Sequence, residues 1–221
     1  MNKKLLGIFV GLLAMGAVAS AATTSCTSVP SWTLASGNVS NGTLFSDVGV
    51  FGGTTPDACT AYGLTFSNFS VYINSGFPTS PSTLPFSMTV AFQADGSVIF
   101  GSNIIPGQDI NLQYKIVSGI SGEILSSGGS TGTGVTENVC STQQTFPGGT
   151  CNGVTLGSGF VNASGSIPIV IAANSVDWIF KDVSGTSAFT EKVVPEPMTL
   201  SMMGIGLLGL GLMRRRQQGK K

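Results

Sequence analysis

The side chains that could carry out acid, base or nucleophilic chemistry are few in this chain. No histidine occurs, which excludes Ser-His-Asp and Cys-His catalysis and histidine-based zinc or iron sites. Asp177 and Asp182 lie five positions apart, so on one strand they face opposite sides and form a poor acid/base pair. Glu123 and Glu137 could act as the two carboxylates of a glycosidase, but nothing in the neighbouring sequence indicates it. We therefore expect no enzyme activity and no catalytic or cofactor-binding residues.

Metal binding is the next chemistry to consider, because three acids lie near expected loops. Asp47, Asp57 and Asp109 could join backbone oxygens in a Ca²⁺ site. The sequence has no dense acidic loop like that of an EF-hand, which favours solvated loop carboxylates. Thiolate sites need cysteines close together, and no CxxC pair occurs. We therefore expect neither a metal site nor a cofactor.

Aromatic side chains could form a platform on which sugar rings stack. The candidates are all the Trp and Tyr residues of the chain: Trp32, Trp178, Tyr62, Tyr72 and Tyr114. Aromatic residues on strands more often belong to the core. A core position is therefore the favoured interpretation, and a sugar platform is the alternative.

The composition limits which elements can position these residues. Only 9% of the 221 residues are charged and 31 are glycine, which suits short strands and turns and disfavours long helices. Several segments alternate apolar and polar residues with the period of a strand, and turn residues separate them. These segments are 64–73, 86–92, 97–100, 110–116, 159–161, 167–172, 176–183 and 187–193.

Short strands with one apolar face must pack against a second sheet. The sequence therefore predicts an all-β fold, a β-sandwich, with a jelly roll as the alternative. Asp95-Gly96 lies between two alternating segments and predicts a hairpin. Residues 126–134 are nearly all Ser, Gly and Thr and predict a flexible loop or a loose strand edge.

Charge is distributed unevenly along the chain. Seven of the ten Lys and Arg residues lie in the two ends, whereas residues 22–193 hold three lysines, nine acids and no arginine, a net charge of −6. Nucleic acid binding needs cations that neutralise phosphates. We therefore exclude nucleic acid as a partner.

The N-terminus has the three parts of a secretory signal peptide. Lys3 and Lys4 form the positive region, residues 5–18 are apolar, and Ala19 and Ala21 supply small residues for cleavage before Ala22. A lasting membrane anchor is the alternative, but the apolar run is short for a span. We therefore expect residues 1–21 to be removed after the export machinery has translocated the chain.

Four cysteines fit an exported chain, because export leads to an oxidising compartment. Cys140 and Cys151 flank a turn-rich connection, Cys26 lies near the start of the mature chain, and Cys59 follows a glycine-rich stretch. Of the three connectivities, we favour Cys26–Cys59 with Cys140–Cys151. Free buried thiols are the alternative.

The C-terminus combines three features in a fixed order. Pro195-Glu196-Pro197 precedes an apolar, glycine-rich stretch over residues 198–213, and a basic end over residues 214–221 begins with Arg214, Arg215 and Arg216. As a helix the apolar stretch would reach ~24 Å at ~1.5 Å per residue, which is short for a membrane core of ~30 Å. The arginines would hold its end in the cytoplasm.

This tail, over residues 194–221, resembles the PEP-CTERM sorting signal of Gram-negative bacteria. The resemblance implies processing by an exosortase at the Pro-Glu-Pro motif after transient anchoring in the inner membrane. It also implies an association with exopolysaccharide, biofilm or surface layers. Residues 59–70, and Lys181-Asp182 before the final strand, resemble segments of uncharacterised PEP-CTERM proteins, which carry no known activity.

Together these features predict an exported β-domain over residues 22–193 between a signal peptide and a sorting tail. We expect a structural or adhesive protein of the cell envelope, outer surface or extracellular matrix, associated with extracellular polysaccharide. A secreted carbohydrate-binding module is the alternative, and a secreted hydrolase is the least favoured class.

Overall fold

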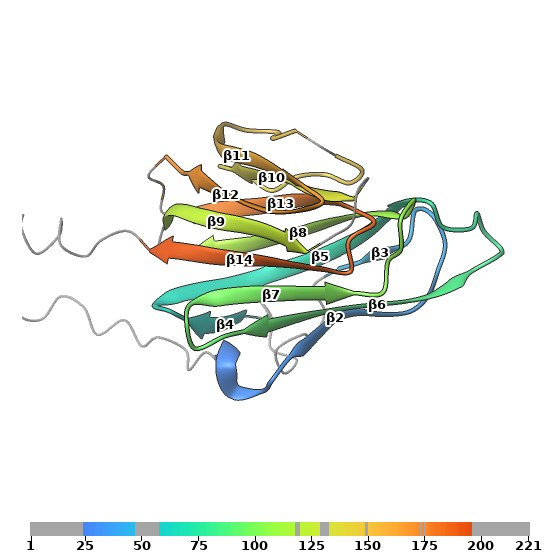
Figure 1. Ribbon diagram of the computed structural model, residues 1–221, viewed down its shortest axis with the longest axis horizontal. Helices are drawn as coiled ribbons and strands as arrows, with labels where there is room; N and C mark the ends of the chain where they lie inside the picture. Colours follow the sequence, from blue (N-terminus) through green and yellow to red (C-terminus); the bar gives the residue numbers. More distant parts are fainter. Residues whose placement is uncertain are drawn as a thin grey trace, which may run out of the picture.

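The chain folds into two β-sheets that pack face to face (Figure 1). The computed structural model describes residues 24–46, 58–117, 120–128, 133–148, 150–172, 174 and 176–195. Within them the only helical element is the short 3-10 turn η2, Cys26–Ser28. The all-β sandwich predicted from the alternating segments is therefore confirmed.

The first sheet has the strand order β1-β4-β5-β8-β13-β10-β11, and β3 pairs with β5 beside this path. Only β1 and β4 run parallel; the other pairs in this sheet are antiparallel. Its strands are β1 (Thr24–Ser25), β3 (Leu44–Phe45), β4 (Ala58–Ala61), β5 (Leu64–Ser75), β8 (Asp109–Val117), β10 (Gly134–Cys140), β11 (Thr155–Asn162) and β13 (Val176–Ser184).

The second sheet has the order β12-β9-β14-β7-β6-β2, and all its pairs are antiparallel. After β8 the chain crosses repeatedly between the sheets, which brings β10 and β13 of the first sheet over β9 and β14 of the second (Figure 1). Its strands are β2 (Trp32–Val39), β6 (Leu84–Phe92), β7 (Ser97–Ser102), β9 (Ile120–Gly128), β12 (Ser164–Val170) and β14 (Ala188–Pro195).

Alternate residues of each strand fill the space between the sheets, because successive side chains of a strand point to opposite faces. The inward residues of β6 and β8 are all buried, as the period-two pattern predicts: Phe86, Met88, Val90, Phe92, Ile110, Leu112, Tyr114 and Ile116. One continuous core results.

Two tight turns connect neighbouring strands. Between β6 and β7 the Asp95 carboxylate accepts hydrogen bonds from the backbone N and the hydroxyl of Ser97, and Gly96 has φ +88°, so the predicted Asp-Gly hairpin is confirmed. Between β4 and β5, Tyr62 and Gly63 both have positive φ, as the favoured two-residue hairpin turns require.

The structure has strands that the alternating segments did not predict, among them β2, β4, β9 and β10, and it differs most clearly from two stated expectations. Ser126, Ser127 and Gly128 were expected in a loop or at a strand edge, but they belong to β9, which lies between β12 and β14. Neighbours on both sides supply ladder hydrogen bonds, which compensate for weak strand propensity. The last strand continues through Val194 and Pro195, so two residues assigned to the tail belong to the sheet.

Three expected segments lie wholly or mostly outside the described residues. These are the signal peptide over residues 1–21, the apolar stretch over residues 198–213 and the basic end over residues 214–221. Within the described part of the chain, no helix has the length and apolar character to cross a membrane.

Candidate functional site

Ionisable side chains gather in the middle of the sandwich, where an apolar core is expected. The group consists of Tyr114 on β8, Glu123 on β9, Glu137 on β10, Lys181 on β13 and Glu191 on β14. All five are buried; Glu123 is the most exposed, at 2%. Both sheets contribute, and we call this group the buried cluster.

Strand register sets the geometry of the buried cluster. Glu137 and Lys181 are direct partners on the antiparallel strands β10 and β13, and Lys181 Nζ contacts Glu137 Oε2. From the opposite sheet, Glu191 Oε2 lies 3.0 Å from Lys181 Nζ and accepts the hydrogen bond that the Tyr114 hydroxyl donates. Lys181 therefore lies between carboxylates of both sheets.

The third carboxylate of the cluster is less well satisfied. Neither oxygen of Glu123 has a hydrogen-bond partner among the described residues. One oxygen each of Glu123, Glu137 and Glu191 lies within 4.8 Å of the other two. Such spacing would suit a cation, and Lys181 already supplies one at this position.

Burial makes charge in the cluster costly. Three carboxylates and one ammonium would carry a net charge of −2 in a space closed to water, which is costly. Burial lowers the pKa of Lys181, although Glu191 opposes this. Burial and the adjacent Glu191 raise the pKa of Tyr114 well above its usual value. The Tyr114 hydroxyl therefore stays protonated and donates its hydrogen bond.

Aromatic rings surround the lysine. Its Nζ lies 5.9 Å from the ring centroids of both Tyr114 and Phe189. Phe100 stacks on Phe189 with 4.9 Å between centroids. The apolar rings exclude water, so any chemistry of the buried cluster takes place between the protein's own groups.

Glu123 and Glu137 are a possible glycosidase pair from sequence, although their neighbouring residues do not support that role. The structure brings them together with Lys181 and Glu191, but inside a closed core. Both missed residues had a sequence signal, because each occupies an inward position between apolar residues two positions away: Ile179 and Val183 for Lys181, Phe189 and Val193 for Glu191. Asp177 and Asp182 lie on opposite faces of β13, as predicted.

A second feature lies on the outer face of the first sheet. A hollow of about 240 Å³ is lined by β10, β11 and β13 residues and their neighbours: Thr133, Gly134, Thr136, Phe160, Asn162, Asp182 and Ser184. Phe160 is 56% exposed. Burial and a hydrogen bond with Asp109 raise the pKa of Asp182 to about 7. We call this feature the outer hollow.

The expected aromatic candidates do not form a platform. Tyr114 is in the core, Tyr72 stacks on Phe146 with 5.6 Å between centroids, and Trp178 lies under Lys115 Nζ at 5.8 Å. The ring nitrogen of Trp32 donates to the Cys26 carbonyl.

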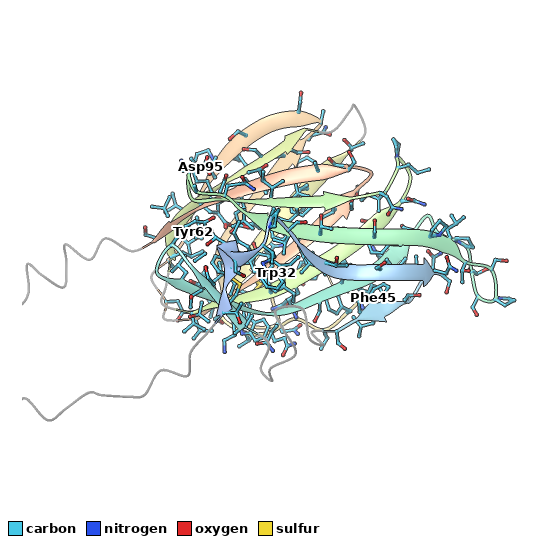
Figure 2. All side chains as sticks on the ribbon, turned by 90° about the horizontal axis from the view of Figure 1, so that it is seen from below. Trp32, Phe45, Tyr62 and Asp95 are labelled. Carbon is cyan, nitrogen blue, oxygen red and sulfur yellow. A yellow bond between two sulfur atoms is a disulfide. The ribbon has the colours of Figure 1, made fainter. Side chains whose placement is uncertain are left out.

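Tyr62 lies near Asp95 at one end of the molecule, and Trp32 and Phe45 lie elsewhere (Figure 2). The Tyr62 hydroxyl donates to the Gln93 carbonyl at 2.6 Å.

The three acids considered for a Ca²⁺ site, Asp47, Asp57 and Asp109, cannot be placed together in the structure. Asp109 accepts a hydrogen bond from Asn74 Nδ2 at 2.8 Å and lies beside Asp182. Asp47 and Asp57 lie outside the described residues. The calcium-site alternative therefore keeps only Asp109 among the positions that the structure describes.

Two disulfides connect the chain as the favoured pairing has it, Cys26–Cys59 and Cys140–Cys151. The second closes a segment that covers the outer face of the first sheet, where Gln144 N donates to Gln113 Oε1 at 2.7 Å. No cysteine is free.

These observations define a disulfide-bonded β-sandwich with an ionisable cluster in its core. Residues 193–216 match the family described as the PEP-CTERM protein-sorting motif. This match confirms the predicted PEP-CTERM sorting signal at the end of the chain. The motif implies an exported protein that is anchored transiently in the membrane and processed by an exosortase.

Comparison with known proteins says less about the β-domain than about the sorting motif. No curated protein matches the chain. The solved structure of TmCBM61 in complex with beta-1,4-galactotriose is similar with a TM-score of 0.27 and 15% identity, covering 47% of this chain and 70% of that one.

Proposed function

We propose that this protein is a non-catalytic structural or adhesive component of the cell envelope or extracellular matrix of a Gram-negative bacterium, associated with exopolysaccharide. The observation that carries the proposal is the position of the sorting motif. It begins at Val193, which is buried in β14, so the β-domain and the sorting signal are continuous. A domain delivered in this way remains at the surface on which it is processed.

The β-domain has properties that suit such a role. Two disulfides restrict its unfolded chain, and its carboxylate-rich cluster is closed to any substrate. The acidic domain repels anionic polysaccharide at long range. Association with exopolysaccharide would therefore rest on hydrogen bonds and ring contacts, and it would persist at high salt.

Cells that lack this chain test the proposal. We expect them to retain less polysaccharide and to attach less firmly to surfaces, and we expect the full chain to restore both properties. A chain that ends at Pro195, the last residue of β14, would be exported without being sorted, and it should not restore them. Unchanged attachment and unchanged matrix in the deletion strain would contradict the structural role.

The alternative, a secreted carbohydrate-binding module, is favoured by one observation. The outer hollow combines an exposed ring, Phe160, with the Asp182 carboxyl and the Asn162 amide. Rings stack on sugar faces while carboxyl and amide groups bond to hydroxyls. A neutral sugar is the ligand that fits these groups best.

A glycan array with the exported domain distinguishes the two functions. Phe160→Ala should abolish binding if the outer hollow is a sugar site. Ile105→Ala is the matched control, because Ile105 is similarly exposed, at 60%, and does not line the hollow. Binding that survives Phe160→Ala, or no glycan bound at all, would argue against the module.

A further inference from the structure

The buried cluster holds an amine and a carboxyl group in contact, inside the core and between two strands of fixed register. Lys181 Nζ contacts Glu137 Oε2, and both side chains are fully buried. Because β10 and β13 pair residue by residue on both sides of this point, the two groups cannot separate while the sheet is intact. Fixed proximity of this kind is equivalent to an effective concentration of about 10⁵–10⁸ M.

The protonation states in such a place differ from those in water. One proton transfer across the contact converts the ammonium and carboxylate into an amine and a carboxylic acid. In water hydration favours the ions, but in the core that hydration is lost. The neutral pair is a nucleophile facing an electrophilic carbonyl carbon.

A third group is placed to move protons. Glu191 Oε2 lies 3.0 Å from Lys181 Nζ, and its carboxyl is within reach of the Glu137 carboxyl. The hydrogen bond from Tyr114 holds Glu191 in this position. Glu191 can therefore accept a proton from the attacking nitrogen and return it to the departing hydroxyl.

We propose that Lys181 and Glu137 join in an intramolecular amide bond, made by the folded protein itself. Lys181 Nζ attacks Glu137 Cδ, the new C–N bond forms, and the C–O bond to the hydroxyl breaks. Glu191 carries the proton from nitrogen to that hydroxyl, and one water molecule leaves. No oxidant, reductant or other reactant is needed.

The cross-link explains features of the cluster that an ion pair leaves unexplained. It removes one positive and one negative group from the core and leaves Glu123 and Glu191 as the carboxyl groups of the cluster, with Tyr114 donating to Glu191. It also ties β10 to β13 in the interior of the first sheet, and it encloses β11 and β12, which lie between them in sequence. This inference goes beyond the proposed function and stands without it.

Peptide mapping of the mature, exported protein tests the proposal. Between residues 24 and 195 the chain has three lysines, at 115, 181 and 192, and no arginine. Trypsin cannot cut after an amide-linked lysine. After reduction of the Cys140–Cys151 disulfide, we therefore expect one fragment from Ile116 to Lys192, lighter by one water molecule than its sequence mass.

A second digestion after aromatic residues locates the bond. A cut after Phe160, which precedes Val161, separates Glu137 from Lys181 along the chain, so the cross-link must leave a branched peptide with two amino termini. Separate fragments 116–181 and 182–192, with a free Lys181 amine after denaturation, would overturn the proposal. A branch joining Lys181 to Glu191 would overturn the choice of Glu137.

Two variants complete the test. Glu191→Gln keeps both reacting groups but removes the proton carrier. Trypsin should therefore cut this variant after Lys181, and its mass should equal its sequence mass with no water missing. Lys192→Met changes an exposed lysine on the same strand, and its intact mass should still be one water short. An unlinked wild-type chain that releases a divalent ion to a chelator would overturn the cross-link in favour of a metal site.

Discussion

At the residue scale, the inward positions of β9, β10, β13 and β14 depart from the apolar pattern. Replacing a buried ion pair by apolar residues is often neutral or stabilising. The pair of Lys181 and Glu137 is therefore poorly explained as a source of stability. A reaction between the two groups explains why an amine and three carboxylates lie together in a core that could have been filled by Leu and Val.

The Asp182 carboxyl in the outer hollow gives a pH-dependent prediction. Its pKa in the folded protein is about 7, against 3.8 for the ordinary group, because it is buried beside Asp109. A raised pKa means that its effect on stability is most favourable below about pH 4 and is lost as the pH rises to about 7. Wild type should lose stability on the order of 1–2 kcal/mol between pH 5 and pH 8, allowing for solvent screening. Asp182→Asn should not show this loss, because its side chain does not ionise.

Thermal unfolding of both proteins at pH 5 and pH 8 measures this effect as a difference. Asp95→Asn is the control with the opposite sign, since hydrogen bonds from Ser97 lower the pKa of Asp95. That variant lacks the stability that the Asp95 carboxylate contributes above about pH 4, so its deficit relative to wild type should be the same at pH 5 and pH 8 and should shrink only at lower pH. Parallel pH profiles for wild type and Asp182→Asn would contradict the prediction.

Two glycines with similar φ angles distinguish the destabilisation caused by a positive φ from the destabilisation caused by a steric clash. Gly76 has φ +76° and Gly96 has φ +88°. A Cβ at Gly76 would collide with the Gly107 carbonyl oxygen, whereas nothing lies within 4 Å of one at Gly96. We expect Gly96→Ala to cost about 1–2 kcal/mol and Gly76→Ala about 3–5 kcal/mol. Denaturant unfolding of both variants checks this, and equal losses would refute it.

At the scale of elements, the two disulfides close loops of different length. The sequence separation is 33 for Cys26–Cys59 and 11 for Cys140–Cys151. Chain entropy predicts losses of about 4 and about 3 kcal/mol when each pair is replaced by serine. Unfolding of the two double variants in denaturant checks the order.

Thiol labelling of the denatured, unreduced wild type provides the control for the disulfide prediction. It should give no signal, because no cysteine is free. A larger loss from the Cys140–Cys151 variant would show that covering the outer face matters more than loop length.

Many of the strands could be predicted from sequence because their pattern is local, whereas β2, β4, β9 and β10 were not. Alternating residues such as those of β6 and β8 report a buried face directly. The segment over residues 126–128 could not be placed in this way, because its strand state depends on β12 and β14, which pair with it from far along the chain. Tertiary pairing there overrides a composition typical of loops.

The buried cluster was beyond sequence analysis for a related reason. Glu123, Glu137, Lys181 and Glu191 come from four strands in two sheets, and strand order is not encoded in local pattern. A charged residue at an inward position was visible in β13 and β14. Its partners could be found only once the sheets were assembled, and the same holds for the neighbours of Phe160 in the outer hollow.

At the scale of the whole molecule, the last residues of β14 belong both to the folded domain and to the sorting motif. The motif begins at Val193, and Pro195 is the last residue of the strand. Proline cannot donate a ladder hydrogen bond and restricts the residue before it to extended backbone. The strand therefore ends within the matched residues, so the sorting signal follows the last strand without a linker.

The order of motif, apolar stretch and arginines predicts that the tail is a processing signal and not a lasting anchor. Replacing Pro195-Glu196-Pro197 by alanines should leave export intact, because residues 1–21 are unchanged, but should trap a longer, membrane-bound form that the exosortase does not cut. The control is the double variant Gln217→Ala, Gln218→Ala. Its changes lie beyond the matched residues 193–216, so it should be processed normally.

Mass spectrometry of the surface fraction gives the C-terminus of each form. Since Arg214, Arg215 and Arg216 halt export only until cleavage, the wild-type surface protein should lack them. A surface protein that still ends at Lys221 would show that the tail is a plain anchor.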